Sequence, residues 1–191
     1  MGFDKCGIRL GEKPGDPLLL SHIADQLSRI FDSVILIADR ADRVQALDHQ
    51  VFVDLYPGTG HLGAIATALH YAPTEIVFLT ACDMPWVNEP LIRHMLALQA
   101  ESGAQGVFSW KGDYVEPLYG LYGKSMEPLA LSQIAQGKYK IMDLIRQSRI
   151  EYLQEAEWRG LTGGVDIFAN LNTVEDLTLL DQVRASWKEP R

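Results

Sequence analysis

The feature that most constrains the fold is a short apolar run, residues 76–79, that is followed closely by Asp83. The run is too short for a helix and rich in β-forming residues, so it predicts a strand buried on both faces, as inside a parallel sheet. Open α/β sheets bind ligands beyond the carboxyl ends of their strands. A carboxylate at that position can hold a divalent cation that grips phosphates, and an Asp that only caps the next turn is the alternative interpretation.

Strand and helix patterns alternate on both sides of this run. Apolar residues recur at helical spacing in some segments and form short unbroken runs in others. The predicted strands are 34–38, 51–53 and 76–79, and the predicted helices are 18–31, a short one within 39–49, one that opens near residue 61, and 90–99. Such alternation is typical of a doubly wound α/β fold.

The second half of the chain is less regular and rich in β-forming residues. Two β-rich segments flank Lys111-Gly-Asp113, which predicts a hairpin and hence an antiparallel strand within or beside the parallel sheet. The predicted strands here are 106–110, 116–122 and 150–153, with 166–170 extended, and the predicted helices are 128–136, 141–147 and one that opens at residue 173.

Composition limits the class of protein. The chain has 191 residues, 47% of them hydrophobic and 22% charged, which is the balance of one ordinary globular domain. The net charge of -8 gives no support for nucleic-acid binding, which normally needs a basic face. Cys6 and Cys82 fit neither a disulfide framework nor a zinc spacing, and no apolar run reaches membrane-spanning length. We therefore expect a cytoplasmic protein without nucleic-acid or membrane partners.

The segment Gly58-Thr-Gly-His-Leu-Gly63 matches the pattern G-x-G-x-x-G of dinucleotide-binding folds. It precedes a predicted helix, and Asp83 lies at about the expected distance beyond it. In that fingerprint the first glycine follows a strand directly, whereas residues 54–57 intervene here. A nicotinamide-dependent enzyme is therefore a weaker hypothesis that stays open.

Five short segments form an ordered set along the chain. They are Met1-Gly-Phe-Asp-Lys5 with Pro17-Leu-Leu19 and His22, Gly60-His-Leu-Gly-Ala-Ile65, Thr80-Ala-Cys-Asp-Met-Pro85, Glu116-Pro-Leu118 with Tyr122, and Asn170-Leu-Asn-Thr173 with Glu175. In this order they resemble landmarks of the molybdenum cofactor guanylyltransferase family over nearly the whole chain. The resemblance implies a three-layer, Rossmann-like nucleotide-diphospho-sugar transferase fold. Its sheet would be mostly parallel with one antiparallel strand, in a single domain of residues 1–191.

The resemblance also implies roles for individual residues. Asp83 would bind Mg²⁺ at the triphosphate and Lys5 would contact the phosphates, which makes these two the predicted catalytic residues. The predicted nucleotide-binding residues are Gly2, Lys5, Asp54, Gly60, Leu62 and Asp83, and the residues predicted on the pterin side are Asn170 and Asn172.

The implied reaction is Mg²⁺-dependent transfer of GMP from GTP to molybdopterin, with release of pyrophosphate. The attacking phosphate oxygen is already anionic, so alignment and charge neutralisation suffice. The implied partners are GTP, molybdopterin and the maturation proteins of molybdoenzymes. Ile37, His61 and Ala64 depart from the family pattern. A cytidylyltransferase therefore stays open, as does an inactive homologue that binds a partner or pterin.

The family begins with a strand and a Leu-Ala-Gly-Gly-x-x-x-Arg loop that this chain does not match. A doubly wound sheet places its first strand centrally, here between the predicted strands at 34–38 and 76–79. Without that central strand, backbone groups of the two neighbouring strands would be unpaired, and each buried unpaired group would cost about 1–3 kcal/mol of stability. We therefore expect residues ahead of Met1, or another segment, to fill it, and we expect these two strands not to pair directly.

Overall fold

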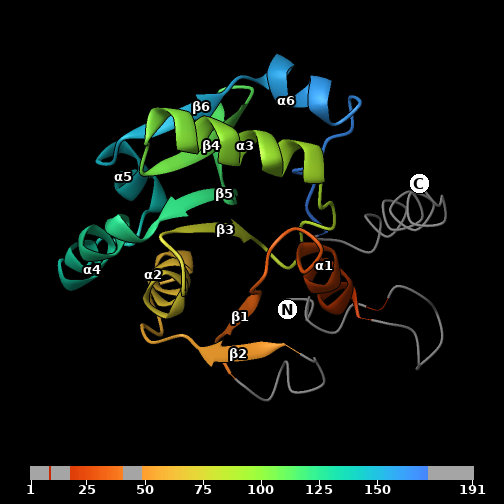
Figure 1. Ribbon diagram of the computed structural model, residues 1–191. Coiled ribbons are helices and arrows are strands. Elements are labelled where there is room, and N and C mark those ends of the chain that lie inside the picture. The colour runs from red at the N-terminus through yellow and green to blue at the C-terminus, as the bar shows by residue number, and fades with distance from the viewer. Residues whose placement is uncertain (1–8, 10–17, 41–48, 172–191) are drawn as a thin grey trace.

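The computed structural model describes residues 9, 18–40 and 49–171, which form two sheets surrounded by helices (Figure 1). The strands are β1 (Ile35–Ala38), β2 (Gln50–Val53), β3 (Ile76–Thr80), β4 (Gly106–Lys111), β5 (Tyr114–Gly123) and β6 (Ile150–Leu153). The helices are α1 (Leu19–Leu27), α2 (His61–Tyr71), α3 (Glu89–Ser102), α4 (Glu127–Ala135), α5 (Ile141–Arg146) and α6 (Glu155–Leu161), with a 3₁₀ turn, η3 (Lys124–Met126).

The sheets combine parallel and antiparallel pairing, as the sequence predicts. β1 pairs with β2 in parallel, and the larger sheet has the order β3-β5-β4-β6. In the larger sheet β5 runs antiparallel to both β3 and β4, whereas β4 and β6 are parallel. Three of its four strands therefore run in one direction and β5 runs against them. The β4–β5 connection is the predicted hairpin, with Gly112 at φ 57° in its turn.

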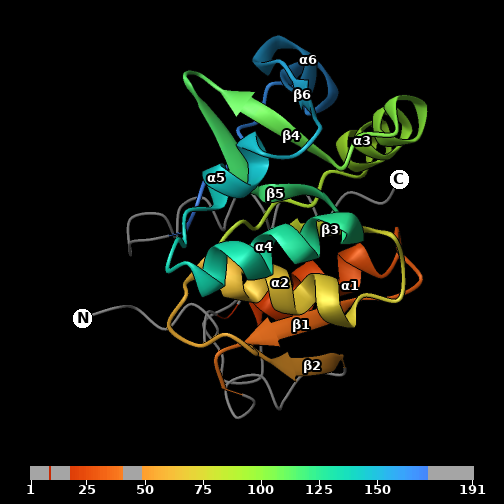
Figure 2. The same cartoon turned by 90° about the vertical axis from the view of Figure 1, so that its left-hand side faces the viewer.

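Helices cover both faces of the larger sheet, which makes three layers (Figure 2). Successive residues of β4 point to opposite faces, and each joins a different core cluster. Phe108 packs with buried residues of α2, α4 and α5, while Val107 packs with buried residues of α3 and α6. The site of interest lies where these layers end, beyond β3 and β5.

The helix predictions are largely confirmed. α2 buries the predicted apolar face, which comprises Leu62, Ile65, Ala66 and Leu69. Asn88 caps α3, since its Oδ1 accepts a hydrogen bond of 2.9 Å from the Leu91 N–H. The sequence patterns missed α6, and they were wrong about residues 166–170, where a turn replaces the extended segment. The short helix expected within 39–49 falls mostly on residues outside the described part, and the closing helix falls on them entirely.

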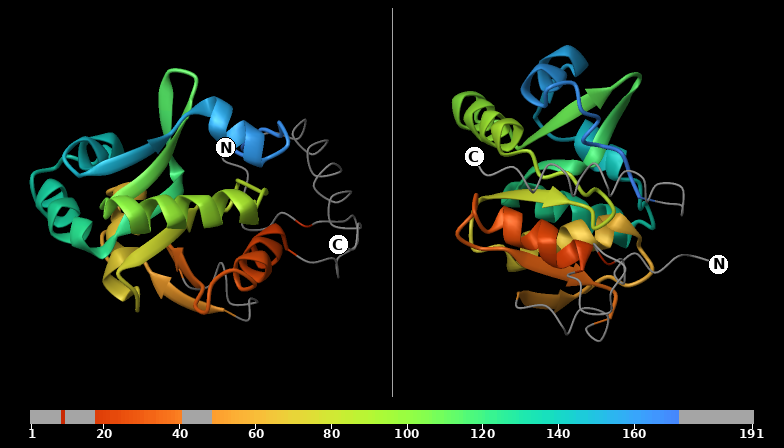
Figure 3. Two further views of the ribbon diagram at one scale, coloured as in Figure 1. Left: turned by 45° about the horizontal axis from the view of Figure 1, so that its top comes forward. Right: turned by 90° about the vertical axis from the view of Figure 1, so that its right-hand side faces the viewer.

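The prediction that β3 is buried on both faces is wrong. All five residues of β3 and all four of β1 are only half-buried. The two strands lie in separate sheets (Figure 3). Both line a cavity of about 820 Å³, so neither is fully covered. The expectation that these strands do not pair directly is confirmed. Nowhere in the described part of the chain is there a helix long and apolar enough to cross a bilayer.

Candidate functional site

Asp83 lies in a turn just beyond the end of β3, as predicted. Three backbone hydrogen bonds hold this turn. The Ala81 N–H donates to Leu118 O at 3.1 Å, and the Met84 N–H donates to Ala81 O at 3.2 Å. The Leu171 N–H donates to Asp83 O at 2.9 Å, which fastens the turn to a segment far along the chain. The position of Asp83 is therefore set by β3, by β5 and by the C-terminal segment together.

A second carboxylate, Glu116 of β5, lies close enough to Asp83 for their charges to interact. Its side chain is buried, and burial raises the pKa of Glu116, a shift to which the charges of Asp83 and Asp166 add. The hydrogen bond from the Leu118 N–H to Glu116 Oε1, 2.9 Å long, and the charge of Lys111 oppose that shift. The sequence identified Glu116 only as part of a motif and did not predict this neighbourhood.

An ion pair between Lys111, at the end of β4, and Asp166 lies near Glu116. Lys111 Nζ lies 2.9 Å from Asp166 Oδ2. Burial acts to lower the pKa of Lys111, but its hydrogen bond and charge interaction with Asp166 outweigh this, so the pKa is raised. Lys111 is therefore a firmly held cation near the two carboxylates, and sequence analysis did not single it out.

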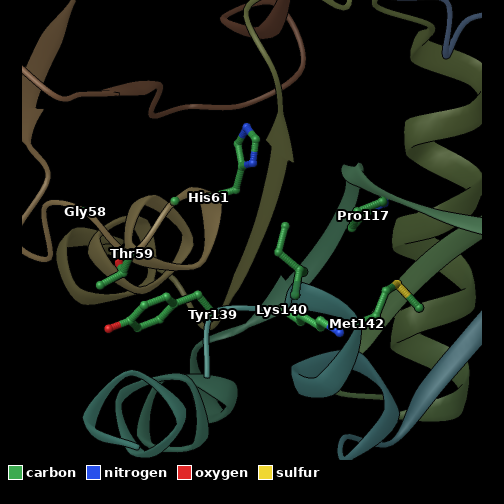
Figure 4. Close-up of a pocket in the computed structure, with 9 residues that line it drawn as sticks. Gly58, Thr59, His61, Pro117, Tyr139, Lys140 and Met142 are labelled. Carbon is green, nitrogen blue, oxygen red and sulfur yellow. The ribbon is translucent and has the colours of Figure 1, made fainter. Parts of the chain in front are cut away.

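The glycine loop before α2 lines a second cavity, of about 510 Å³ (Figure 4). Gly58 and Gly60 have φ of 82° and 65°, a conformation that glycine adopts at no steric cost. Across the cavity lie Pro117 and the segment of Tyr139 and Lys140. Gly60 thus lines a ligand-sized hollow, and its contact with a nucleotide stays a prediction.

Lys140 lines this cavity and has no counter-ion among the residues that the structure describes. Within the described residues it forms no ion pair or hydrogen bond, whereas Lys138 Nζ donates to Gln136 Oε1 at 2.8 Å. His61 lines both this cavity and the larger one between β1 and β3. An ammonium group that lines such a cavity can attract an anionic ligand.

Asp54, another predicted nucleotide-binding residue, already has two protein donors. Its Oδ1 accepts hydrogen bonds of 2.9 Å from the Tyr56 N–H and from the Thr67 hydroxyl of α2. Thr67 Oγ1 in turn accepts a hydrogen bond from the Leu55 N–H at 3.0 Å. Asp54 therefore fixes the loop that leads to Gly58, and its contact with a nucleotide stays a prediction.

The remaining predicted residues differ in where the structure places them. The Leu62 side chain is fully buried in the core, so only its backbone is available to a nucleotide. Asn170 is exposed and directly precedes Leu171, which bonds to the Asp83 turn. Gly2, Lys5 and Asn172 lie outside the described residues, and their roles stay predictions.

The local structure does not meet the requirements of a dinucleotide fingerprint. β2 ends at Val53, and residues 54–57 separate it from Gly58. The glycine therefore cannot form the tight strand-to-helix turn that the pyrophosphate of a dinucleotide requires.

Asp83 and Glu116 suit a hard cation that takes some of its ligands from the protein and the others from the substrate. Across the described residues no group of three or more His, Cys, Asp or Glu side chains is placed to hold a metal ion. Asp83 and Glu116 supply oxygen donors, the type that Mg²⁺ prefers, and Mg²⁺ commonly takes its other ligands from phosphates and water. Asp83 is the better candidate because it lies in the turn beyond β3, whereas Glu116 is buried and burial raises its pKa.

Comparison with known proteins agrees with this geometry. Residues 1–152 match the family of MobA-like NTP transferase domains. A probable molybdenum cofactor guanylyltransferase of Peptoclostridium acidaminophilum is 31% identical over 193 residues, covering 98% of this chain and 86% of the relative. The molybdenum cofactor guanylyltransferase of Syntrophotalea carbinolica is 28% identical over 176 residues, covering 92% and 82%.

Solved structures confirm the predicted fold class. Molybdopterin-guanine dinucleotide biosynthesis protein A from Archaeoglobus fulgidus superposes with a TM-score of 0.78 at 21% identity, over 96% of this chain and 94% of that one. A 2-C-methyl-D-erythritol 4-phosphate cytidylyltransferase from Thermus thermophilus reaches 0.65 at 12% identity, over 91% and 92%. From its sequence match over most of its length, the chain belongs to the family of MobA-like NTP transferase domains, a family of nucleotidyltransferases.

Proposed function

We propose that this protein transfers GMP from GTP to molybdopterin in a Mg²⁺-dependent reaction that releases pyrophosphate. The observation that carries the proposal is the Asp83 turn, which holds a carboxylate beyond the end of β3, where α/β folds bind ligands. The names of the relatives suggest the substrates, since one is a molybdenum cofactor guanylyltransferase and another is named as a probable one.

In the proposed reaction an oxygen of the molybdopterin phosphate attacks the α-phosphorus of GTP. The new P–O bond forms as the bond from the α-phosphorus to the bridging oxygen of pyrophosphate breaks, and pyrophosphate leaves with that electron pair. No protein base is required because the nucleophile carries no proton to remove. Mg²⁺, when bound, neutralises charge on the triphosphate, and Asp83 would hold it. The protein supplies alignment and electrostatic stabilisation.

The cavity between the glycine loop and Lys140 is the proposed place for an anionic part of the substrates. Its walls include Pro117, the residue after Glu116 in β5. Lys140 supplies positive charge in a protein whose net charge is -8. The product would pass to molybdoenzyme maturation proteins, and we propose the cytoplasm as the compartment because both substrates are soluble metabolites.

The direct test measures pyrophosphate release from the purified protein with Mg²⁺, molybdopterin and either GTP or CTP. We expect release with GTP only, and only when molybdopterin is present. Faster release with CTP would contradict the choice of base and favour a cytidylyltransferase. Pterin binding without turnover would indicate the inactive homologue.

Replacing Lys140 with glutamine is expected to raise KM for molybdopterin by about 10- to 100-fold, with a smaller effect on KM for GTP. The reason is the loss of a charge-assisted hydrogen bond to an anion, worth about 1.5–3 kcal/mol. Initial rates of pyrophosphate release at varied molybdopterin concentration measure the change. Lys138→Gln is the matched control, because Lys138 is two residues away, exposed and already bonded to Gln136. Equal effects of the two substitutions would contradict a specific role for Lys140.

A further inference from the structure

The carboxyl group of Glu116, in β5, is buried and only partly bonded. The residue is 7% exposed, and its Oε1 accepts one hydrogen bond of 2.9 Å from the Leu118 N–H. No described residue forms a hydrogen bond or an ion pair with its Oε2. A carboxyl group loses free energy of hydration when it is buried, and a neutral glutamine would lose less. The free oxygen therefore indicates a hydrogen-bond donor that comes from a ligand.

An orphaned hydroxyl group lies beside this carboxyl group. Ser109 of β4 is directly opposite Glu116 in the strand pairing, so the two side chains lie on the same face of the sheet. Ser109 is fully buried, and its Oγ has no hydrogen-bond partner in the described part of the chain. Buried hydroxyl groups normally have a partner. Two polar groups on different strands thus lack partners at one place.

This place lies on the face of the sheet that α3 and α6 cover. Side chains alternate between the faces along a strand. Val115 and Trp110, which adjoin Glu116 and Ser109 in their strands, pack in the core cluster of α2, α4 and α5. Glu116 and Ser109 therefore point to the opposite face, where the charge of Asp83 also acts on Glu116.

The charges around Glu116 favour a ligand that donates hydrogen bonds. Asp83, Asp166 and Lys111 all act on Glu116, and Lys111 is already paired with Asp166. Carboxyl groups are thus in excess, which suits N–H donors and disfavours a phosphate. The side chains of Lys111 and Asp166 are 23% and 39% exposed, so the group is open to solvent on their side.

A planar ring with two adjacent N–H donors matches these features. A carboxylate accepts two such bonds side by side, as it does from the fork of an arginine guanidinium. The 2-amino-4-oxopyrimidine ring of a pterin presents a similar fork, made by its 2-amino group and the neighbouring ring N–H. We propose that Glu116 binds this edge of the molybdopterin ring and so determines specificity for the acceptor. The inference rests on the proposed function, in which molybdopterin is the acceptor.

Guanine carries the same fork, but the structure offers the nucleotide other room. Asp83 also lines the cavity of about 820 Å³ between β1 and β3, which Glu116 does not line. Leu118 is its only lining residue from β5. A cavity of this size can hold a nucleotide. Because both substrates must meet at Asp83, a nucleotide in that cavity leaves the side of Glu116 to the pterin.

The test measures binding, without turnover, of two fluorescent probes, the phosphate esters of 6-hydroxymethylpterin and of 6-hydroxymethyllumazine. Lumazine has an oxygen in place of the 2-amino group, so it offers one donor and one acceptor where pterin offers two donors. We expect wild-type protein to bind the pterin probe at least about 10-fold more tightly. The amide of Glu116→Gln is itself one donor and one acceptor, so this variant should prefer the lumazine probe. Fluorescence titration measures both dissociation constants.

The matched control is Glu151→Gln, the same change on β6, which should keep the wild-type preference. Circular dichroism checks the fold of both variants. Equal affinity of wild-type protein for the two probes, or binding of neither, would overturn the proposal whatever the variants do. An unchanged preference in folded Glu116→Gln would overturn it as well.

Two further measurements distinguish this role from others. Xanthosine triphosphate lacks the 2-amino group of GTP, and calorimetry with Mg²⁺ should give the same preference for GTP in wild-type protein and in Glu116→Gln. A preference that shifts here, and not for the probes, would assign the fork to guanine. Loss of Mg²⁺-dependent GTP binding as large as in Asp83→Asn would make Glu116 a metal ligand instead. A reversed probe preference in a protein that releases no pyrophosphate would support the inference and refute guanylyl transfer alone.

Discussion

Replacing Asp83 with asparagine is expected to lower the rate of pyrophosphate release by about 1000-fold and to abolish Mg²⁺-dependent binding of GTP. The amide keeps the shape of the side chain but removes the charge that holds the cation. Loss of several kcal/mol of charge stabilisation corresponds to about three powers of ten in rate. The fold should persist, because it is the backbone oxygen of Asp83, not its carboxylate, that bonds to Leu171. Calorimetric titration with GTP and Mg²⁺ measures the binding, and circular dichroism checks the fold.

Asp113→Asn is the matched control for this substitution. Asp113 is exposed in the turn of the β4–β5 hairpin, so the same chemical change there should leave both binding and rate unchanged. Equal affinity of wild-type protein and Asp83→Asn for GTP with Mg²⁺ would disprove the metal assignment.

Replacing Gly63 with alanine is expected to lower the free energy of unfolding by about 3 kcal/mol, at the upper end of the cost of overpacking. A Cβ atom at Gly63 would lie 2.2 Å from Thr59 Oγ1 and 2.7 Å from Tyr56 O. Neither atom can move without disturbing the loop, because Thr59 donates its hydroxyl to Tyr56 O and Asp54 holds the Tyr56 N–H. Urea denaturation measures the loss. We expect weaker GTP binding as well, since the displaced loop carries Gly58 and Gly60.

Gly160→Ala is the control, because it adds the same methyl group to helix α6. Nothing lies within 4 Å of a Cβ at Gly160, so this change should stabilise the protein by up to about 1 kcal/mol. Wild-type stability of Gly63→Ala would contradict the close packing of α2 against its preceding loop.

Local patterns located most elements of the fold because those elements carry their own signals. The apolar face of α2 repeats at helical spacing, and Asn88 with Pro90 marks the start of α3. α6 was missed because only Trp158 of its seven residues is buried, which leaves no periodic pattern. The burial of β3 was misjudged because an apolar run shows that a strand prefers to be covered, but not which other segments cover it.

Residues of the candidate site could be predicted only where the pattern of a single segment identifies them. Asp83 could be identified because an apolar run of residues ends close to it. Its proximity to Glu116 depends on the register of β3 with β5, in which Thr80 lies opposite Tyr119. The register between strands that are distant in the sequence depends on packing across the whole sheet, so it cannot be predicted from the residues of one segment. The ion pair of Lys111 with Asp166 could not be predicted for the same reason, since the two residues are distant in the sequence.

The bond from Leu171 to Asp83 has a consequence for how the protein matures on the ribosome. A translating ribosome adds about 5–20 residues per second, so Leu171 is made roughly 4 to 18 s after Asp83. During that interval the turn that carries Asp83 lacks its anchor from the C-terminal segment. The nascent chain should therefore build α2 and the hairpin of β4 and β5 early, and complete the turn that carries Asp83 only after residue 171 has been made. A chain released early by a premature stop would be folded in part and catalytically silent.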